Sequence, residues 1–119
     1  MKLVVKITET GRVKLRLSKS LKTEFLRVLI LFIQYTDDNI RRDRKLTYHN
    51  NDSRVYNASL QEVFLKHHTQ LSIIDQESKI TLTRVQAHVF WGCCMEWSDD
   101  AFQNPQMGGM LVDLHKALS

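Results

Sequence analysis

The chain has 119 residues, of which 43% are apolar and 25% are charged, and its formal net charge is +4. This length and composition fit one ordinary globular domain and exclude a wholly disordered chain. The charge is divided unevenly: residues 1–45 contain 12 Lys and Arg against 5 Asp and Glu, a net +7, whereas residues 46–119 contain 5 against 8, a net −3. This asymmetry indicates a basic surface offered to a negatively charged partner.

The N-terminus and the apolar runs bear on where the protein resides. Lysines interrupt the first apolar residues, so the chain does not begin with the apolar core of a secretory signal. The longest apolar run, Val28 to Ile33, is far shorter than the ~20 residues that span a membrane. We therefore expect a cytoplasmic protein without a transmembrane helix or a membrane partner.

Residues 2–17 contain two segments in which apolar and basic side chains alternate, joined by a polar link that includes Gly11. This alternation predicts two strands, and the short link predicts an antiparallel hairpin. The apolar side chains would share one face: Leu3, Val5, Ile7, Val13, Leu15 and Leu17. The basic side chains would share the other: Lys2, Lys6, Arg12, Lys14 and Arg16.

Three interpretations of this basic hairpin face remain open. Lysines on an exposed strand protect a sheet edge from aggregation without binding a partner. A basic two-stranded ribbon can also enter the DNA major groove and release phosphate counterions, or it can meet an acidic protein. For the nucleic-acid or anion-binding interpretation, the candidate residues here are Lys6, Arg12, Lys14 and Arg16.

The segment 13–18, followed by a helix with Leu21 and Phe25 inward, locally resembles the strand-into-helix entry of ribbon-helix-helix repressors. Those proteins start close to that strand and continue into a short second helix. This chain has an extra strand before it and a long polar segment after its first helix. The resemblance is local and does not assign the chain to that family.

The first helix is expected over residues 19–35, with Ser18 or Ser20 as its cap. Its core-facing stripe would comprise Leu21, Phe25, Val28, Leu29, Phe32 and Ile33. Further apolar side chains leave only a narrow polar strip of Thr23, Arg27 and Gln34. Such a helix is either central to the core or part of a subunit interface.

Residues 37–57 are polar, and they add a dense basic run to the candidate anion-binding set: Arg41, Arg42, Arg44 and Lys45. The segments 46–48 and 54–56 predict a candidate second short hairpin around the turn-prone residues 49–52. A flexible solvated loop is the alternative. Tyr48 and Tyr56 beside the basic run would suit a nucleic-acid surface.

A second helix is expected over residues 58–73, opened by a capping box at Ser59 and Glu62. Its apolar face would comprise Leu60, Val63, Phe64 and Leu71. His67 projects among these residues, so we expect a hydrogen-bonded core or boundary histidine there. Residues 79–82 would form a short strand or the approach to the next helix.

The third helix is expected over residues 83–97, capped by Thr83 and apolar on nearly every side. One face would comprise Val85, Val89, Phe90, Cys93 and Trp97, and another Ala87, Trp91, Cys94 and Met95. The adjacent cysteines should be reduced and buried, with a reactive thiol or an intermolecular bridge as the alternative. A polar notch between the faces, made by His88, Gly92 and Glu96, is a candidate small-ligand site. Close helix packing at Gly92 is the favoured alternative.

The C-terminal region contains breaks at residues 98–105 and a pair of glycines, Gly108 and Gly109, which we interpret as a hinge. A final helix is expected over residues 109–118. Its inward face would comprise Met110, Leu111, Leu114 and Leu118.

No catalytic or metal-binding motif is recognisable, and the least implausible catalytic cluster is Tyr48, His49 and Asp52. We therefore expect a non-enzymatic interaction module without cofactor or metal. The predicted fold is a single α+β domain over residues 1–119: an N-terminal antiparallel hairpin, and a candidate second one, packed on about four helices. Surplus apolar surface on the first and third helices predicts a homodimer. Binding of DNA or RNA, or of an acidic protein, through the basic hairpin face is the alternative function.

Overall fold

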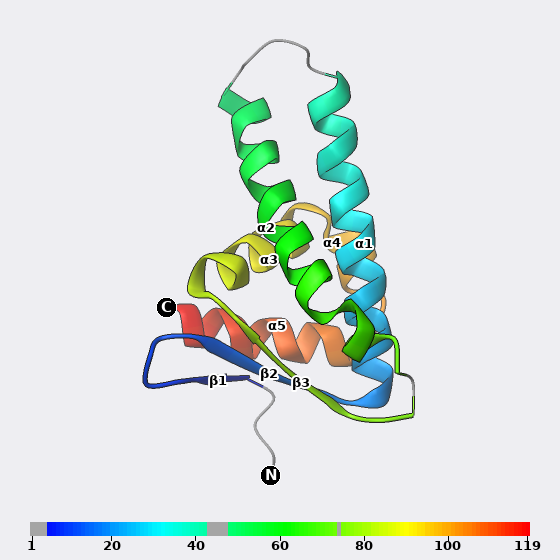
Figure 1. Cartoon of the computed structure of the whole chain (residues 1–119), viewed down its shortest axis with the longest axis vertical. Helices are drawn as coiled ribbons and strands as arrows, with labels where there is room; N and C mark the ends of the chain where they lie inside the picture. The colour runs from blue at the N-terminus through cyan, green and yellow to red at the C-terminus, as the bar shows by residue number, and fades with distance from the viewer. Residues whose placement is uncertain (1–4, 43–47, 74) are drawn as a thin grey trace.

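The computed structural model describes residues 5–42, 48–73 and 75–119, and of residues 48–52 it describes the backbone alone. It shows an α+β fold in which helices pack on one face of a small antiparallel sheet (Figure 1), so the predicted fold class is confirmed. The elements in chain order are β1 (Val5–Ile7), β2 (Val13–Leu17), α1 (Lys19–Arg42), α2 (Tyr48–Leu71), β3 (Ser78–Leu82), α3 (Arg84–Glu96), α4 (Ser98–Ala101) and α5 (Pro105–Leu118).

The sheet has the order β1-β2-β3, with β2 paired antiparallel to both neighbours. The predicted N-terminal hairpin is confirmed, and Gly11 is the residue that turns the chain. Its φ is +80°, a left-handed conformation that glycine adopts without steric cost. The Thr8 carbonyl accepts a hydrogen bond from the Gly11 amide at 2.9 Å, which closes the turn.

The predicted apolar face of the hairpin packs on the core: its β1 residues Val5 and Ile7 are partly buried, and Leu3 lies outside the described residues. Val13, Leu15 and Leu17 of β2 are fully buried, and Ile80 and Leu82 of β3 join them on the same face. Above them, rings of α1 stack on rings of α3 and of the residue that follows it: the ring centroids of Phe25 and Phe90 are 4.5 Å apart, and those of Phe32 and Trp97 are 5.6 Å apart. The buried apolar side chains of sheet and helices form one core cluster.

The polar segment after α1 does not form the predicted second hairpin, because α1 continues to Arg42 and α2 already begins at Tyr48. Residues 46 and 47 lie outside the described part of the chain. The side chain of Asn57, 8% exposed, donates hydrogen bonds to the Ile33 carbonyl at 3.1 Å and to the Thr36 hydroxyl at 3.0 Å. This contact between the two helices favours helix over the local turn preference of the polar residues. The capping box predicted at Ser59 therefore falls inside a helix.

Helices α1 and α2 run antiparallel as a long pair (Figure 1), and each has 24 residues. Among the described residues, none of the helices is long and apolar enough to cross a membrane. The predicted inward stripe of α1 is buried except for Ile33, which is partly buried. Of its surplus apolar side chains, Leu26 is partly buried against the core, whereas Ile30 is 38% exposed.

A lysine is fully buried in the first turns of α1. The ammonium of Lys22 donates hydrogen bonds to the backbone carbonyls of Ile73 and Gln76. These two carbonyls belong to the connection between α2 and β3. Because a buried ammonium needs acceptors, Lys22 fastens this connection to α1 and fixes the approach to β3.

Capping residues determine where α3 and α5, which follow β3, begin. Thr83 and Gln86 form a capping box at the start of α3, which confirms the predicted cap. The Asn104 side chain accepts a hydrogen bond from the Gln106 amide at 2.8 Å, and Pro105 occupies the first turn of α5. Proline is compatible with this position because backbone N–H groups in the first turn of a helix have no acceptor within the helix, so the N–H that proline lacks is not needed. The predicted hinge at residues 108–109 is therefore wrong, since both glycines lie inside α5.

Candidate interaction surfaces

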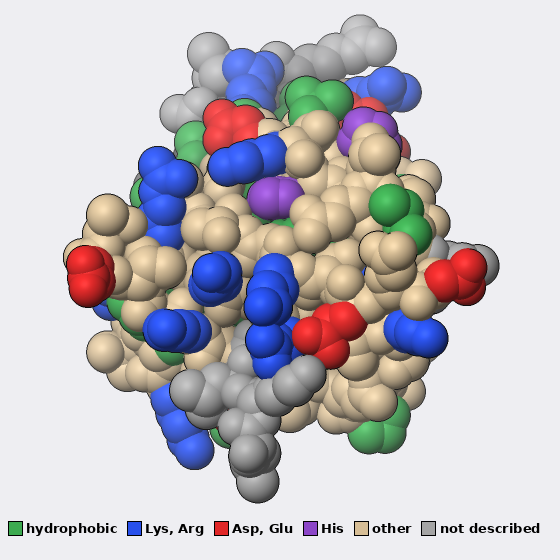
Figure 2. Space-filling view, turned by 60° about the horizontal axis from the view of Figure 1, so that its bottom comes forward, with side chains coloured by type: hydrophobic (Ala, Val, Ile, Leu, Met, Phe, Trp, Pro, Cys, Tyr) green, Lys and Arg blue, Asp and Glu red, His purple; other side chains and the backbone are tan. Residues whose placement is uncertain are grey.

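The outer face of the sheet gathers the basic residues of the hairpin. Lys6 and Lys14 are direct partners across β1 and β2, and Arg16 pairs in register with Lys79 of β3. We call the following five residues the basic face: Lys6, Arg12, Lys14, Arg16 and Lys79. All are exposed except Arg16, which is partly buried. Figure 2 shows Lys and Arg side chains grouped on the side of the molecule that bears the sheet.

Lys79 is the residue of this surface that sequence reasoning missed. It joins the hairpin through the pairing of β2 with β3, between segments more than 60 residues apart in the chain. The one ion pair within this surface links Arg16 to Glu77 at 3.2 Å, among the described residues. Four cations of the basic face thus form no ion pair with a carboxylate among the described residues: Lys6, Arg12, Lys14 and Lys79.

The arginines at the end of α1 form no part of this surface. Helix α1 begins beside β2 and rises for 24 residues, so Arg41 and Arg42 lie about 33 Å from its first residue along the axis. Arg41 is paired with Asp37 of the same helix at 3.1 Å. Arg44 and Lys45 lie outside the described residues. The candidate anion-binding residues on the hairpin and those at the end of α1 therefore lie on two separate parts of the molecule.

A second surface is an apolar groove between α3 and α5, with a volume of about 330 Å³. The following residues line it: Trp91, Met95, Phe102, Leu111, Val112 and His115, with Lys116 at its rim. Met95, Phe102 and Val112 are 39%, 43% and 55% exposed. The Trp91 and His115 rings lie 5.0 Å apart and join the two helices at the groove.

Helix α3 leaves apolar surface uncovered in this groove, at Met95, and outside it, at Val85. Ala87, Phe90, Cys93 and Cys94 are buried in the core, as the sequence predicted for most of the helix. Val85 was expected on the inward face and is instead 62% exposed, because it lies in the first turn of α3 at the edge of the core.

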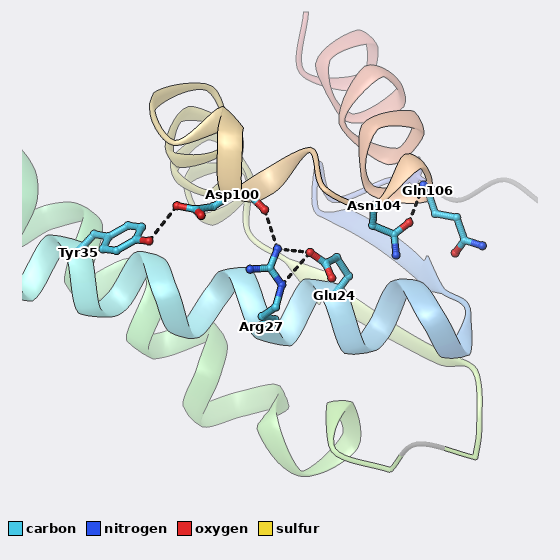
Figure 3. Close-up of polar contacts among 6 residues, drawn as sticks. All are labelled: Glu24, Arg27, Tyr35, Asp100, Asn104 and Gln106. Atoms are coloured by element: carbon cyan, nitrogen blue, oxygen red, sulfur yellow. Dashed lines mark hydrogen bonds and ion pairs between the residues drawn. The ribbon is translucent and has the colours of Figure 1, made fainter.

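Polar contacts between α1 and α4 hold one wall of the groove in place (Figure 3). The Arg27 guanidinium donates to the backbone carbonyl of Asp100 at 2.6 Å and is bound to Glu24 of its own helix. The Tyr35 hydroxyl donates to the Asp100 carboxylate at 2.8 Å. The hydrogen bond with Asp100 raises the pKa of Tyr35, and the one with Glu24 raises the pKa of Arg27. These bonds fix α4, and with it Phe102, which follows that helix directly.

The start of α5 is tied to α1 in a similar way. The Gln106 side-chain oxygen accepts hydrogen bonds from the hydroxyls of Ser18 at 3.0 Å and Ser20 at 2.8 Å. Ser18 also accepts from the Leu21 amide at 3.3 Å, which confirms its predicted capping role. Both ends of the segment that carries Phe102 are therefore anchored, and the groove is built by the fold itself.

The polar notch predicted on α3 opens into a pocket of about 290 Å³ between α1, α2 and α3. Gly92 and Glu96 line it, whereas His88 is exposed and is not among its lining residues. The other lining residues are Thr36, Asn39, Ser53, Tyr56, Cys93 and Trp97. The favoured alternative of close packing at Gly92 is wrong. Apart from the adjacent residues and the backbone of α3 itself, no heavy atom of the described chain lies within 4 Å of the point where a Cβ would stand.

Three other titratable groups, His67, Cys93 and Cys94, are buried in the core. His67 is 6% exposed and its Nε2 lies 3.2 Å from the Thr81 carbonyl, so the predicted core histidine is confirmed; burial lowers its pKa. Cys93 and Cys94 are free and buried, and burial raises the pKa of Cys93 to about 12 and that of Cys94 further. In residues 5–42, 53–73 and 75–119, no group of three or more His, Cys, Asp or Glu is placed to hold a metal ion. The side chains of the candidate cluster Tyr48, His49 and Asp52 lie outside the described residues.

No model of a known protein family matches the chain, and neither a curated protein nor a solved structure does. The local resemblance to ribbon-helix-helix repressors thus has no support from these comparisons. Functional inference for this chain rests on its own surfaces.

Proposed function

We propose that this protein is a non-enzymatic interaction module that self-associates through the apolar groove between α3 and α5. The observation that carries the proposal is the grouping of Met95, Phe102 and Val112, all substantially exposed, around one hollow of about 330 Å³. Exposed apolar side chains are ordinary when scattered, but a grouped patch around a groove is typical of an interaction site.

A second copy of the chain is a suitable occupant because the patch contains both a hollow and projecting apolar side chains. In a twofold dimer the same patch meets itself, so each subunit must supply both complementary shapes. Here Phe102 of each subunit would enter the groove of the other subunit beside its Trp91. Aromatic residues contribute much of the binding energy in such contacts.

The chemistry of the buried groups also favours binding over catalysis. A nucleophilic cysteine must be accessible as a thiolate, and burial keeps Cys93 and Cys94 protonated. A catalytic histidine must reach a substrate, and the Nε2 of His67 already faces the Thr81 carbonyl in the core. These groups stabilise the fold and are poorly placed for acid-base or nucleophilic work.

Sedimentation velocity over a wide range of protein concentration tests the proposal. We expect the wild-type protein to shift from monomer to dimer as concentration rises. Val112→Lys would place a charge in the contact and remove a valine that the dimer would bury. The loss of about 1.5 kcal/mol or more of binding free energy should raise the dissociation constant of the dimer about tenfold or more.

Val85→Lys is the matched control, because Val85 is equally apolar, is 62% exposed and lies on α3 outside the groove. This variant should dimerise like the wild type. A wild-type protein that stays monomeric at the highest concentration contradicts the proposal. Equal weakening by both substitutions contradicts the location of the contact.

A further inference from the structure

We propose that the basic face of the sheet binds the phosphate backbone of double-stranded nucleic acid. This inference goes beyond self-association, and it uses residues that do not line the apolar groove. The basic face is one surface of one sheet, built from all three strands. Its geometry, its charge and the side chains that accompany it favour this partner over the other anionic partners.

The spacing of the cations suits an extended polyanion. Lys14 and Arg16 alternate along β2 and are about 6.8 Å apart along the strand, and Arg12 directly precedes the strand at the same spacing in sequence. Lys6 and Lys79 lie on the strands either side of β2, about 5 Å away from it in the plane of the sheet. Duplex DNA carries one negative charge for about every 1.7 Å of its axis, so a footprint of this size meets several phosphates.

The charges also repel one another within the sheet. Lys6 and Lys14 are directly opposite across β1 and β2, and like charges at such positions destabilise a sheet. Arg16 has Glu77 as a partner at 3.2 Å, while the two lysines have no ion pair among the described residues. Phosphates laid along the strands would relieve this repulsion, which gives the binding a favourable electrostatic term.

The side chains around these cations disfavour an acidic protein as the partner. Every described apolar residue of the three strands, such as Val5, Leu15 and Ile80, belongs to the opposite, core-facing side. Protein interfaces are centred on apolar and aromatic anchors and are depleted in lysine. The basic face offers lysines and arginines with Thr81 between them and has no such anchor in the described strands.

The same composition favours a duplex over a single strand. Proteins that hold single strands on a sheet stack the bases on aromatic side chains, and the described strands present none on their outer face. Lysine and arginine contacts to phosphates position a duplex without reading its sequence. We therefore expect binding with little dependence on base sequence.

The expected salt dependence of binding follows from the number of cations that are not ion-paired. Lys6, Arg12, Lys14 and Lys79 would neutralise about four phosphates, which predicts a slope of about −3.6 in a plot of log K against log salt concentration. The same slope corresponds to an affinity loss of about 150-fold between 50 and 200 mM salt. Arg16 contributes less to this slope because its charge is already neutralised by Glu77.

Fluorescence anisotropy with a labelled mixed-sequence DNA duplex measures this slope directly. We expect salt-sensitive binding by the full chain, with a weaker complex for the matching single strand. The triple variant Lys6→Gln, Lys14→Gln, Lys79→Gln should bind the duplex much more weakly, with a slope near −0.9 from the remaining arginine. Circular dichroism melting verifies that the variant is folded.

The matched control removes three exposed charges elsewhere, by Arg42→Gln, Arg54→Gln and Lys66→Gln on α1 and α2. Its slope should stay near that of the wild type. Absence of duplex binding at low salt overturns the proposal, and so does an equal loss in the control. Tighter binding of polyglutamate than of the duplex also overturns it, because it would identify an acidic protein as the partner.

Discussion

The substitution Gly92→Ala tests whether α3 needs a glycine for close packing or leaves space beside it. In an exposed helix interior, alanine is more favourable than glycine by about 0.8–1.0 kcal/mol, because glycine loses more backbone entropy on folding. The structure provides room for the added methyl group, since no described neighbour lies within 4 Å of it. We therefore expect Gly92→Ala to stabilise the protein by about 1 kcal/mol, equivalent to a rise of about 4 °C in Tm.

Alanine substitutions at two other glycines serve as comparisons for Gly92→Ala. Gly109 of α5 also has open space at its Cβ position among the described residues, so Gly109→Ala should stabilise by a similar amount. Gly11 has a φ of +80°, where a side chain is strained whatever the space, so Gly11→Ala should destabilise by about 1 kcal/mol. The three variants carry the same chemical change in different backbone environments.

Urea unfolding followed by circular dichroism measures the free energy of unfolding for each variant. A change in the midpoint at constant slope would report a change in stability alone. If Gly92→Ala destabilises the protein while Gly109→Ala stabilises it, then the space beside α3 is filled in solution. That result would refute the open pocket and restore close packing at Gly92.

Three further predictions concern buried titratable side chains: Lys22, His67 and the two cysteines. Lys22→Met should destabilise the protein by about 1–3 kcal/mol, because it leaves the Ile73 and Gln76 carbonyls without their donor; a variant as stable as the wild type in urea would contradict this role. Burial lowers the pKa of His67, so stability should fall as the pH drops below 6.5, its ordinary value, and His67→Gln should flatten that decline in melts across pH. Burial raises the pKa of Cys93 and Cys94, so stability should fall above pH 9, where the unfolded thiols ionise, and thiol labelling of the native protein should proceed no faster than unfolding. Rapid labelling at neutral pH would show that the thiols are accessible.

Local patterns were sufficient for the elements whose structure is decided by near neighbours in the chain. The alternation of residues 5–17 and the turn at Gly11 predicted the hairpin and its buried face. Ser18 and Thr83 predicted two helix starts, because a cap depends on residues only three positions away. His67 was placed in the core because it falls on an otherwise apolar helix face.

Contacts between distant segments explain what the sequence did not predict. The turn-prone residues before Asn57 belong to a helix because Asn57 bonds to α1, and no local pattern shows that partner. Lys79 lies on the basic face because β3 pairs with β2, and this pairing joins segments that are far apart in the sequence. Arg41 and Arg42 belong to a helix and not to the polar segment, because α1 continues beyond its apolar stripe to Arg42. The glycines at 108 and 109 were interpreted as a hinge, but the cap at Asn104 starts the helix before them.

Site-directed cross-linking tests the proposed self-association most directly. The native cysteines are buried with raised pKa values, so a single introduced thiol reports its own surroundings. A short thiol-specific bifunctional reagent should convert Val112→Cys into a covalent dimer, while Val85→Cys, exposed on the same domain outside the groove, should dimerise without being cross-linked. Cross-linking of Val85→Cys in preference to Val112→Cys, or of neither variant at high concentration, would contradict a dimer formed through the groove between α3 and α5.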